Sequence, residues 1–410
     1  MANNSLLTID MITKETLRVA HETAQFIKTT DLQYDAQFAK EGAKIGSALR
    51  IRKPNKYVRT SGTRQLTVQD QNEQSGTLTV ATQDHVGMSF YSSDLTMSID
   101  NFSKRYIEPA VKTLISGIES DFIAFATRNT YNLVGTAGTA MTDLLVPSAA
   151  RARLNQGLAP KDGNRYVQCE SVAMGGLVNG LRGLFQDSSQ IKEQYREGMI
   201  GRTGMADWYE NERMWTMTNT GDVAGEINGG VLTNGITQLT VDGLTVAPSA
   251  GMVFTIGTGG GETVVRMINP ETRAALSAPQ QFVCSAGCTT TNLIFQPPIF
   301  WDSTGPQAAL QNVSGQPADN ADIVFVGALS TSYAQQLMYH KEAFQFVSAD
   351  LPMMEDAHKC SVQEYEGISM RVWQQSDINN DARVMRIDAL YGFAALRPEW
   401  ACRMIGSANS

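Results

Sequence analysis

The sequence predicts an α+β protein into which a separate all-β domain is inserted. Three observations support this class. Residues 101–128 repeat apolar side chains at steps of three and four, as an amphipathic helix does. Residues 45–64 and 75–98 alternate polar and small apolar side chains, as strands do. Residues 222–321 are rich in Gly and Thr and nearly free of helical periodicity, which is typical of a small β domain placed between two mixed regions.

Length and composition favour a globular chain of several units. The chain has 410 residues, of which 42% are hydrophobic and 18% charged, and domains usually contain roughly 100–200 residues. The net charge of −8 argues against a dedicated nucleic-acid binder, which would be basic overall. No apolar run is long enough to predict a transmembrane helix. The amino terminus lacks a basic segment followed by an apolar one, so we expect no secretory signal.

The amino-terminal segment predicts a short amphipathic helix over residues 13–29, with Thr13 as its N-cap. The apolar side chains at helical spacing are Leu17, Ala20, Ala24 and Ile27. A helix so close to a terminus could pack on its own chain, or it could be an arm that docks on a neighbouring subunit.

Residues 45–64 and 75–98 predict the two arms of a long β-hairpin, and the polar segment QDQNEQSG lies between them. The arms contain few large apolar side chains, so the hairpin can bury little surface of its own. Isolated hairpins are marginally stable in water. This hairpin is therefore expected to pack against another surface.

Charges in the hairpin are segregated by arm. The first arm carries only cations, namely Arg50, Arg52, Lys53, Lys56, Arg59 and Arg64. Residues 65–100 carry only acids, namely Asp70, Glu73, Asp84, Asp94 and Asp100. Either the two arms pair with each other, or opposite patches on different copies of the protein recognise one another. On the second interpretation the candidate subunit-interface residues are Arg52, Lys53, Lys56, Arg59, Arg64, Asp70, Glu73 and Asp84.

Residues 101–128 predict the strongest helix in the chain. Its apolar stripe consists of Val111, Leu114, Ile115, Ile118, Phe122 and Phe125. Pro109 suits the first turn, where a backbone N–H is not needed. Lys112, Glu119 and Asp121 fall outside the stripe and predict a solvent-facing side. The pattern indicates a helix that lies across a sheet.

The predicted secondary structure in the middle of the chain changes twice, from mixed to all-β and back. A strand is expected in RYVQCESVAM and a helix over Leu177–Tyr195. From about residue 222, the strands of the inserted domain are predicted in ITQLTVDGL, MVFTIGT, ETVVRMI, QFVCSA and NLIFQPP. The mixed pattern resumes at about Ala321. Insertion into an exposed loop of a host domain explains this order.

No motif predicts catalysis, a cofactor or a metal site. The glycine run at 257–261 precedes a strand, so a hairpin turn is expected rather than a phosphate-binding loop. Cys284 and Cys288 are the only close cysteine pair, and no further ligands lie nearby, so we expect two small residues in a turn. His340 lies among aromatic residues, which is typical of a structural histidine. Five scattered cysteines fit reduced thiols in a cytosol.

The carboxyl-terminal third predicts strands with a turn at Tyr391-Gly392, an interruption at Pro398 and a last strand, WACRMIG. Its phrase DALYGFAALRPEWACRM resembles the terminal strands of the major coat proteins of the P22 phage type. Three other segments resemble that family in the same order: SKRYIEPAVKTLISGIESD, REGMIGRTGMADWYENERM and FVGALSTSYAQQLMYHKEAFQFVSADLP. Their shared order carries the resemblance, which covers most of the chain outside the arm and the β insertion.

The resemblance implies the HK97-type coat fold, divided into six segments along this chain. They are an N-terminal arm (1–45), an extended hairpin loop (46–100), a spine helix with the peripheral domain that the C-terminal strands complete (101–159), a first part of the axial domain (160–221), the inserted β-rich domain (222–321), and the second part of the axial domain with the terminal strands (322–410).

The same resemblance implies a structural protein that is not an enzyme and needs no cofactor. Its copies would form pentamers and hexamers and close an icosahedral shell around the double-stranded DNA of a tailed bacteriophage, without specific DNA binding. The shell would expand after DNA packaging. A scaffolding protein and a portal protein are the further partners implied, and no membrane is. The protein would be located in the virion after assembly in the cytoplasm of the host bacterium.

Two other classes of function are weighed against a coat protein. The Gly- and Thr-rich middle could belong to a secreted or surface-displayed adhesin, although the lack of an export signal and the two long amphipathic helices argue against it. A cytosolic enzyme would need a pocket that the sequence does not indicate. Concentration-dependent growth into uniform particles would separate a coat protein from both, whereas ligand-dependent stabilisation would favour the enzyme.

Overall fold

The chain divides into two units, each built around its own sheet. In the computed structural model, unit 1 comprises Met1–Ile51, Gly76–Phe122 and Phe344–Leu396, and unit 2 comprises Arg52–Ser75, Ile123–Ala343 and Arg397–Ser410. The residues that the structure describes are 9–32, 48–62, 64, 66, 68–69, 71–91, 103–181, 201–220, 224–229, 233–257, 264–354, 359–365, 367–377 and 382–406.

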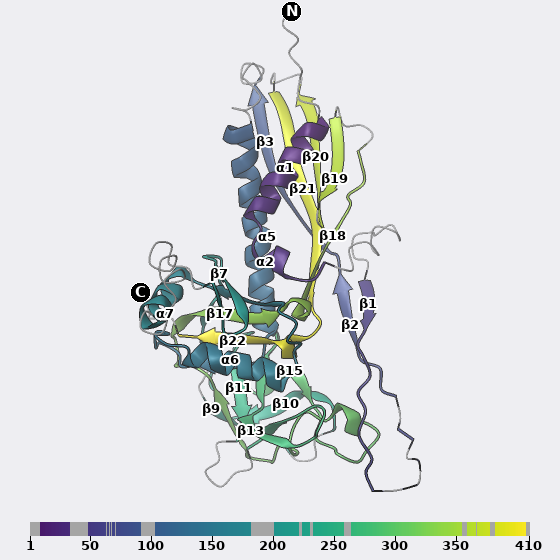
Figure 1. Cartoon of the computed structure of the whole chain (residues 1–410), viewed down its shortest axis with the longest axis vertical. Coiled ribbons are helices and arrows are strands. Elements are labelled where there is room, and N and C mark those ends of the chain that lie inside the picture. The colour runs from purple at the N-terminus through teal and green to yellow at the C-terminus, as the bar shows by residue number, and fades with distance from the viewer. Residues whose placement is uncertain are drawn as a thin grey trace, which may run out of the picture. The chain divides into compact units, whose positions relative to one another are not determined.

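Unit 1 contains a five-stranded antiparallel sheet (Figure 1). Its strands are β18 (Phe344–Ala349), β21 (Ala382–Ala395), β20 (Ile368–Asp377) and β19 (Lys359–Tyr365) in that order, with β3 (Thr82–Tyr91) also paired to β21. The pairing of β3 runs from Thr82 opposite Tyr391 to Tyr91 opposite Ala382. The longest strand, β21, thus joins segments from the two ends of the chain.

Two helices cover this sheet. Helix α1 (Ile9–Thr23) contacts β19 and β20. Helix α5 (Glu108–Asn129) follows a π-helical turn, η2 (Ser103–Ile107), and continues from unit 1 into unit 2 after Phe122. The Phe122 ring of α5 lies 5.4 Å from that of Phe393 on β21 and 5.7 Å from that of Phe346 on β18. The predicted helix over 101–128 and Pro109 in its first turn are confirmed.

The amino-terminal helix is not continuous, contrary to the prediction. It ends at Thr23, and a separate turn, α2 (Phe26–Thr29), follows. The proposed N-cap is also wrong, because the helix begins at Ile9 and Thr13 lies buried inside it. The helix extends toward the amino terminus because Ile12 joins the same buried face as Leu17 and Ala20.

Glu119 explains the break between α1 and α2. The sequence placed it on the solvent-facing side of α5, but its side chain is fully buried. One carboxylate oxygen accepts hydrogen bonds from the backbone N–H groups of Gln25 (2.6 Å), Phe26 (2.7 Å) and Ile27 (3.3 Å). A carboxylate at the first N–H groups of a helix is favourable because these groups have no partner within the helix. The helix therefore restarts there.

The predicted hairpin exists only at its base. Strand β1 (Ala48–Arg52) pairs with β2 (Ser75–Thr79) in a two-stranded sheet. The described residues from Lys53 to Gln74 belong to no strand, and β3 pairs with β21 rather than with the first arm. Pro54 interrupts pairing in the first arm because it lacks a backbone N–H, whereas β21 offers β3 a partner along its whole length. Residues 92–98 of the predicted second arm lie outside the described residues.

The turn predicted at Tyr391-Gly392 is wrong, because β21 continues through both residues to Ala395. A Cβ atom at Gly392 would lie 2.1 Å from the carbonyl oxygen of Thr79. Glycine is thus needed where the end of β2 passes close to β21, and not for a change of chain direction.

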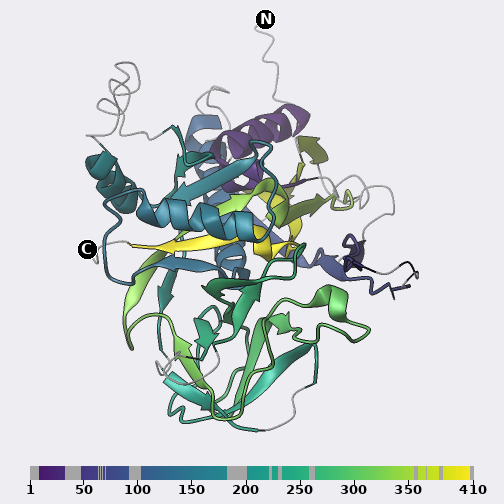
Figure 2. The same ribbon diagram turned by 60° about the horizontal axis from the view of Figure 1, so that its bottom comes forward.

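Unit 2 contains a seven-stranded sheet. Its order is β4 (Leu133–Gly135), β22 (Ala401–Ile405), β17 (Ser332–His340), β5 (Arg165–Cys169), β7 (Ala206–Glu210) and β6 (Arg202–Thr203), with β8 (Thr216–Thr218) also paired to β17. Helix α6 (Leu145–Gln156) contacts β22 and lies along it in Figure 2, where β22 is yellow. The predicted last strand is confirmed as β22, and a 3₁₀ turn, η5 (Pro398–Trp400), precedes it at the predicted proline.

Helix α7 (Ser171–Leu181) follows β5. It begins before the helix predicted over Leu177–Tyr195, and residues 182–200 lie outside the described residues. Two further 3₁₀ turns are η3 (Ala308–Leu310) and η4 (Lys341–Ala343).

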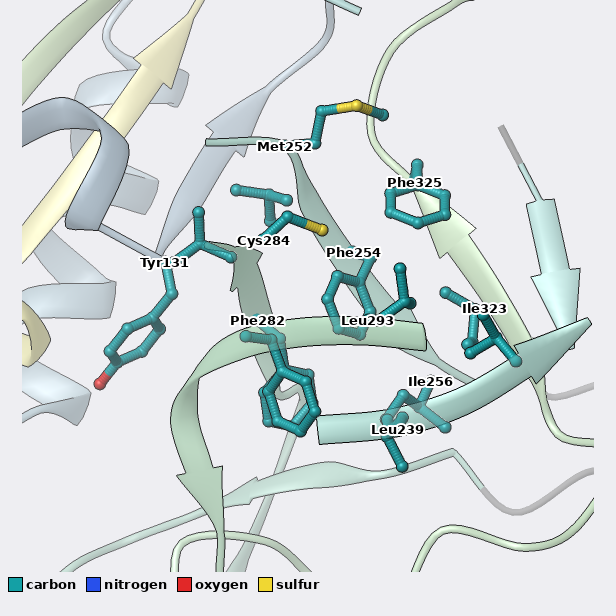
Figure 3. Close-up of a cluster of buried hydrophobic side chains, with 14 of the residues drawn as sticks. Tyr131, Leu239, Met252, Phe254, Ile256, Phe282, Cys284, Leu293, Ile323 and Phe325 are labelled. Carbon is teal, nitrogen blue, oxygen red and sulfur yellow. The ribbon is translucent and has the colours of Figure 1, made fainter. Parts of the chain in front are cut away.

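Within unit 2 the Gly- and Thr-rich region forms a closed six-stranded barrel. Its order is β10 (Ile236–Asp242), β15 (Asn292–Ile299), β14 (Gln281–Cys284), β11 (Val253–Ile256), β16 (Asp322–Phe325) and β9 (Ala224–Ile227), and β12 (Arg266–Ile268) pairs separately with β13 (Ala275–Pro279). The predicted strands ITQLTVDGL, MVFTIGT, QFVCSA and NLIFQPP are confirmed, whereas of ETVVRMI only Arg266–Ile268 forms a strand and residues 262–263 lie outside the described residues. Four buried rings, those of Phe254, Phe282, Phe295 and Phe325, pack on one another inside the barrel, and Figure 3 shows Phe254, Phe282 and Phe325 among them.

Buried side chains join the barrel to the sheet of unit 2. Arg403 of β22 is fully buried, and it donates hydrogen bonds to the carbonyl oxygens of Thr130 (2.7 Å) and Gly251 (2.8 Å). The Gln281 amide of β14 exchanges two 2.8 Å bonds with the backbone of Leu133 in β4. Desolvation lowers the pKa of Arg403 to about 9. These bonds fix the base of the barrel against the host sheet.

Candidate functional site

The cationic candidates lie on the loop of residues 53–74 and on the strand just before it. Figure 1 shows this loop as the dark trace that leaves β1 and returns at β2. Arg52, Lys56, Arg59 and Arg64 are exposed, and Lys53 is half-buried. Four of the five cationic candidates thus lie at the surface of the described part of the chain.

Of the three acidic candidates, Glu73 is the one that lies on the described part of this loop. Its carboxylate lies 3.6 Å from the Arg52 guanidinium, and both side chains are more than half exposed. Exposed ion pairs contribute about 0–1 kcal/mol. This contact agrees with the interpretation in which the two arms pair with each other, although it is too weak to hold them. Asp70 lies outside the described residues.

Asp84 belongs to a different unit from the other described candidates. It lies on β3 of unit 1, and its carboxylate accepts a 2.7 Å hydrogen bond from the Tyr391 hydroxyl. Desolvation, followed by this bond and the Asp84 charge, raises the pKa of Tyr391 far above its usual value. Asp84 therefore stabilises the pairing of β3 with β21.

Hydrogen bonds hold the described part of the loop in place. The Lys53 N–H donates to the Gln74 carbonyl (2.7 Å), and the Gln69 side chain bonds to the backbone N–H and carbonyl of Val58. Asn72 donates a 2.7 Å bond to the Pro306 carbonyl in the segment that follows β15. The Gln69 bonds thus link the two sides of the loop, and the bonds of Lys53 and Asn72 tether it near its ends.

Lys56 has an altered electrostatic environment although its side chain is exposed. Desolvation lowers the pKa of Lys56, the nearby Glu399 carboxylate acts in the opposite direction, and Arg273 and Lys53 lower it further. The ammonium group is therefore held near other charges of unit 2.

Sequence reasoning missed the apolar side chains of the loop. Tyr57 is 59% exposed, Leu66 84% and Val68 82%, the last two being the highest values among the exposed large hydrophobic residues. The alternation of Leu66 and Val68 with polar neighbours was the available signal, but alone it predicts a half-buried strand. Isolated exposed apolar residues are ordinary, whereas several on one unpaired loop mark an interaction site.

The described residues show neither a metal-binding cluster nor a membrane-spanning helix. Among them, no group of three or more His, Cys, Asp or Glu side chains could hold a metal ion. In the part of the chain that the structure describes, no helix is both long and apolar enough to cross a membrane. The loop with its cations and exposed apolar side chains is therefore the candidate functional site.

Comparison with known proteins gives one strong match. The model of a family described as "P22 coat protein - gene protein 5" matches residues 1–406. No curated protein sequence matches the chain.

Among solved structures, a chain from Mycobacterium phage Che8 is 11% identical, with 93% of this chain and 90% of that chain covered and a TM-score of 0.47. The capsid of the cyanophage P-SCSP1u is 12% identical, with 90% and 85% covered and a TM-score of 0.42. The capsid of the Helicobacter pylori bacteriophage KHP30 is 10% identical, with 89% and 85% covered and a TM-score of 0.40. At these identities no residue role carries over.

Proposed function

The chain belongs to the P22 coat protein family, and we propose on this basis how its copies meet in a shell. Its function is structural: it is a major capsid protein, many copies of which form the icosahedral shell of a bacteriophage, and it is part of the virion. The match of the family model to residues 1–406 carries this conclusion. Nothing in that match supports the adhesin alternative.

The loop of residues 53–74 is proposed to bind a neighbouring copy. Leu66, Val68 and Tyr57 are exposed on a segment whose described residues form no strand, and fully burying a side chain such as Leu or Val contributes about 1.5–3 kcal/mol. Surface ion pairs contribute about 0–1 kcal/mol each. The apolar side chains would therefore supply most of the affinity of the contact.

The charged candidates are proposed to set the register of the same contact. Opposite charges across an interface favour the right partner and orientation more than they raise affinity. Arg52, Lys53, Lys56, Arg59 and Arg64 would face acidic groups of the neighbour. Asp70 and Glu73 would face its cations. Asp84 would contribute to the contact by ordering β3, because its carboxylate already accepts a hydrogen bond from the Tyr391 hydroxyl.

The six-part division of the chain is also proposed. Segment 46–100 would be the loop that reaches over a neighbour, and 101–159 would carry the spine helix, in line with the bounds of α5. Segments 160–221 and 322–410 would form the axial domain and terminal strands around the insertion of 222–321. The barrel strands support that insertion, although the last of them, β16 (Asp322–Phe325), lies just past the proposed end at residue 321.

Further features of assembly are proposed from membership of the family. They are a scaffolding protein and a portal protein as partners, assembly in the cytoplasm of the host bacterium, and expansion of the shell after packaging by rigid-body rearrangement of its subunits. The net charge of −8 suits a container that encloses double-stranded DNA without binding it tightly.

Electron microscopy with sedimentation tests the proposal. The purified protein would be studied alone and then with the proteins encoded beside it. Closed uniform shells, or pentamers and hexamers that become shells with a partner, are expected. A stable monomer or small dimer under every condition would contradict the proposed mode of assembly.

An exchange of charges tests whether the register is set between copies. Arg52→Glu and Glu73→Arg subunits should each assemble poorly alone and recover when they are mixed, because opposite charges then meet across the contact. If the charges pair only within one chain, mixing fails and only the double variant recovers. Arg59→Lys, which keeps its charge, serves as the control and should assemble as the unaltered protein does.

A further inference from the structure

A fully buried arginine of unit 2 has no carboxylate partner among the residues that the structure describes. Arg403 of β22 has no exposed surface. Its Nε donates to the carbonyl oxygen of Thr130 and its Nη1 to that of Gly251, whereas its Nη2 has no partner among the described residues. The two carbonyl groups carry no net charge. Buried charges are usually paired with an opposite charge, because removing them from water is costly.

A buried amide that also lacks partners lies on the same face of the sheet. Gln335 of β17 has no exposed surface, and in the described part of the chain neither its Nε2 nor its Oε1 finds a hydrogen-bond partner. Gln335 pairs with Ile405 of β22. Two residues before Ile405, Arg403 pairs with Leu337. Paired residues share one face of a sheet, so Gln335 and Arg403 are diagonal neighbours, and long side chains reach each other across such a diagonal.

This face of the sheet packs on the barrel. Ile405 belongs to the same buried cluster as Cys284 of the barrel strand β14. The carbonyl group that Arg403 binds through Nη1 belongs to Gly251, whose N–H donates to the carbonyl oxygen of Cys284 at 2.8 Å. The unpaired nitrogen atoms of Arg403 and Gln335 therefore face the buried junction between the sheet and the barrel.

The titratable groups around Arg403 do not neutralise it. They are Cys284, Cys402 and Tyr333. Thiols and phenols are uncharged near neutral pH, and desolvation raises the pKa of Tyr333 and brings that of Cys402 to about 12. Desolvation lowers the pKa of Arg403 to about 9, so the guanidinium still carries its charge at pH 7. A buried positive charge thus remains without a counter-charge.

We propose that the junction of sheet and barrel binds a small monovalent anion, chloride in the cell, between Arg403 Nη2 and Gln335 Nε2. Both nitrogen atoms have N–H groups to donate, and bonds that link a guanidinium to an anion are stronger than neutral ones. A water molecule could accept the same bonds and donate to Gln335 Oε1, but it would leave the charge unbalanced. The anion would hold β17 and β22 together beside the barrel, whatever the loop of residues 53–74 binds.

Unfolding of the soluble subunit in chloride and in gluconate, at constant ionic strength, tests the proposal. Gluconate is too large for a site of this kind. A ligand that binds only the folded chain stabilises it with the logarithm of its concentration. The unfolding equilibrium constant should therefore fall about tenfold for each tenfold rise in chloride above the dissociation constant. Stability that is equal in the two salts, or lower in chloride, would overturn the proposal.

Gln335→Glu supplies a carboxylate beside Arg403 that takes the place of the anion. This variant should be stable without chloride, and chloride should no longer change its stability. Gln335→Leu, of similar size but without N–H donors, should need at least tenfold more chloride for the same stabilisation. Gln375→Glu makes the same change at an exposed position of unit 1, and as the matched control it should keep the chloride dependence. An undiminished chloride dependence in Gln335→Glu would contradict the site.

Crystals of the unaltered subunit grown in bromide locate the anion directly, because bromide scatters X-rays anomalously. An anomalous peak within hydrogen-bond distance of Arg403 Nη2 and Gln335 Nε2 is expected. A water molecule alone at this place, or protein atoms that fill it, would show that no anion binds. This measurement decides the question even if a variant at Gln335 fails to fold.

Discussion

Glu119 and Arg403 are charged side chains without exposed surface, and both bind backbone groups. Removing a charge from water is costly unless hydrogen bonds replace the lost hydration. Glu119 accepts three N–H groups at the start of α2, and Arg403 donates to two carbonyl groups in unit 2. Each charge thus fixes the course of a backbone segment that is distant in sequence.

Glu119→Gln should lower the free energy of unfolding by about 1–3 kcal/mol, because bonds to a charged acceptor are stronger than those to a neutral one. Urea unfolding of the soluble subunit, followed by circular dichroism, measures this change. Asp121→Asn on the exposed side of the same helix is the control and should change stability by less than about 0.5 kcal/mol. Equal effects of the two variants would show that the carboxylate does not stabilise α2.

Gly392 lies where β21 and the end of β2 come close together. The carbonyl oxygen of Thr79 is 2.1 Å from the position that a Cβ atom would take. The sheet therefore depends on a residue without a side chain, in the middle of a strand where glycine is otherwise unfavourable.

Gly392→Ala should destabilise the protein by about 1–3 kcal/mol, the usual cost of forcing an extra group into a packed site. Gly87→Ala on the adjacent β3 is a matched control, since nothing lies within 4 Å of its Cβ position. Thermal unfolding of both variants provides the measurement. A loss of stability in Gly87→Ala as large as in Gly392→Ala would refute the steric explanation.

The barrel of unit 2 differs from the open sheets of the two units in being closed. Its six strands close on themselves, so it has no free edge strand, and its aromatic side chains pack on one another. Such an element satisfies its own hydrogen bonds, which explains how it can be accommodated within a host domain. It is attached to the host sheet by the hydrogen bonds of Arg403 and Gln281 and by apolar side chains of the sheet, such as Ile405, that share its buried core.

At the scale of the whole molecule, the proposed role of the loop of residues 53–74 predicts that its substitutions affect assembly and not folding. Changes at Leu66 and Val68 should leave the isolated subunit nearly unaltered, because both side chains are more than 80% exposed and such substitutions usually change stability by less than about 0.5 kcal/mol. In a shell the same side chains would lose their contact with water. Their effect is therefore expected on assembly alone.

The double variant Leu66→Ser, Val68→Ser should raise the protein concentration needed for shell formation by at least tenfold, because each 1.4 kcal/mol lost is about a factor of ten. Sedimentation across a concentration series measures this threshold. The pair Leu66→Met, Val68→Ile keeps the apolar character and should assemble normally. Normal assembly of the serine variant would show that the loop is not part of the interface.

Local patterns in the sequence predicted the helices and strands that depend on residues close together along the chain. The stripe from Val111 to Phe122 predicted α5, because side chains three and four positions apart share one helix face. Short runs between turn residues predicted the barrel strands, and Pro398 predicted the break before β22, because each rests on backbone preferences of a few residues. The order of segments along the chain was also sufficient to indicate a coat protein.

Only the tertiary structure decided which distant groups meet. The bond between Asp84 and Tyr391 joins residues 307 positions apart, and no periodicity specifies such a partner for β3. The burial of Glu119 and the need for glycine at 392 follow from backbone atoms that arrive from other elements. Periodicity reports which face of an element is apolar, whereas pairing and close approach depend on the packed chain.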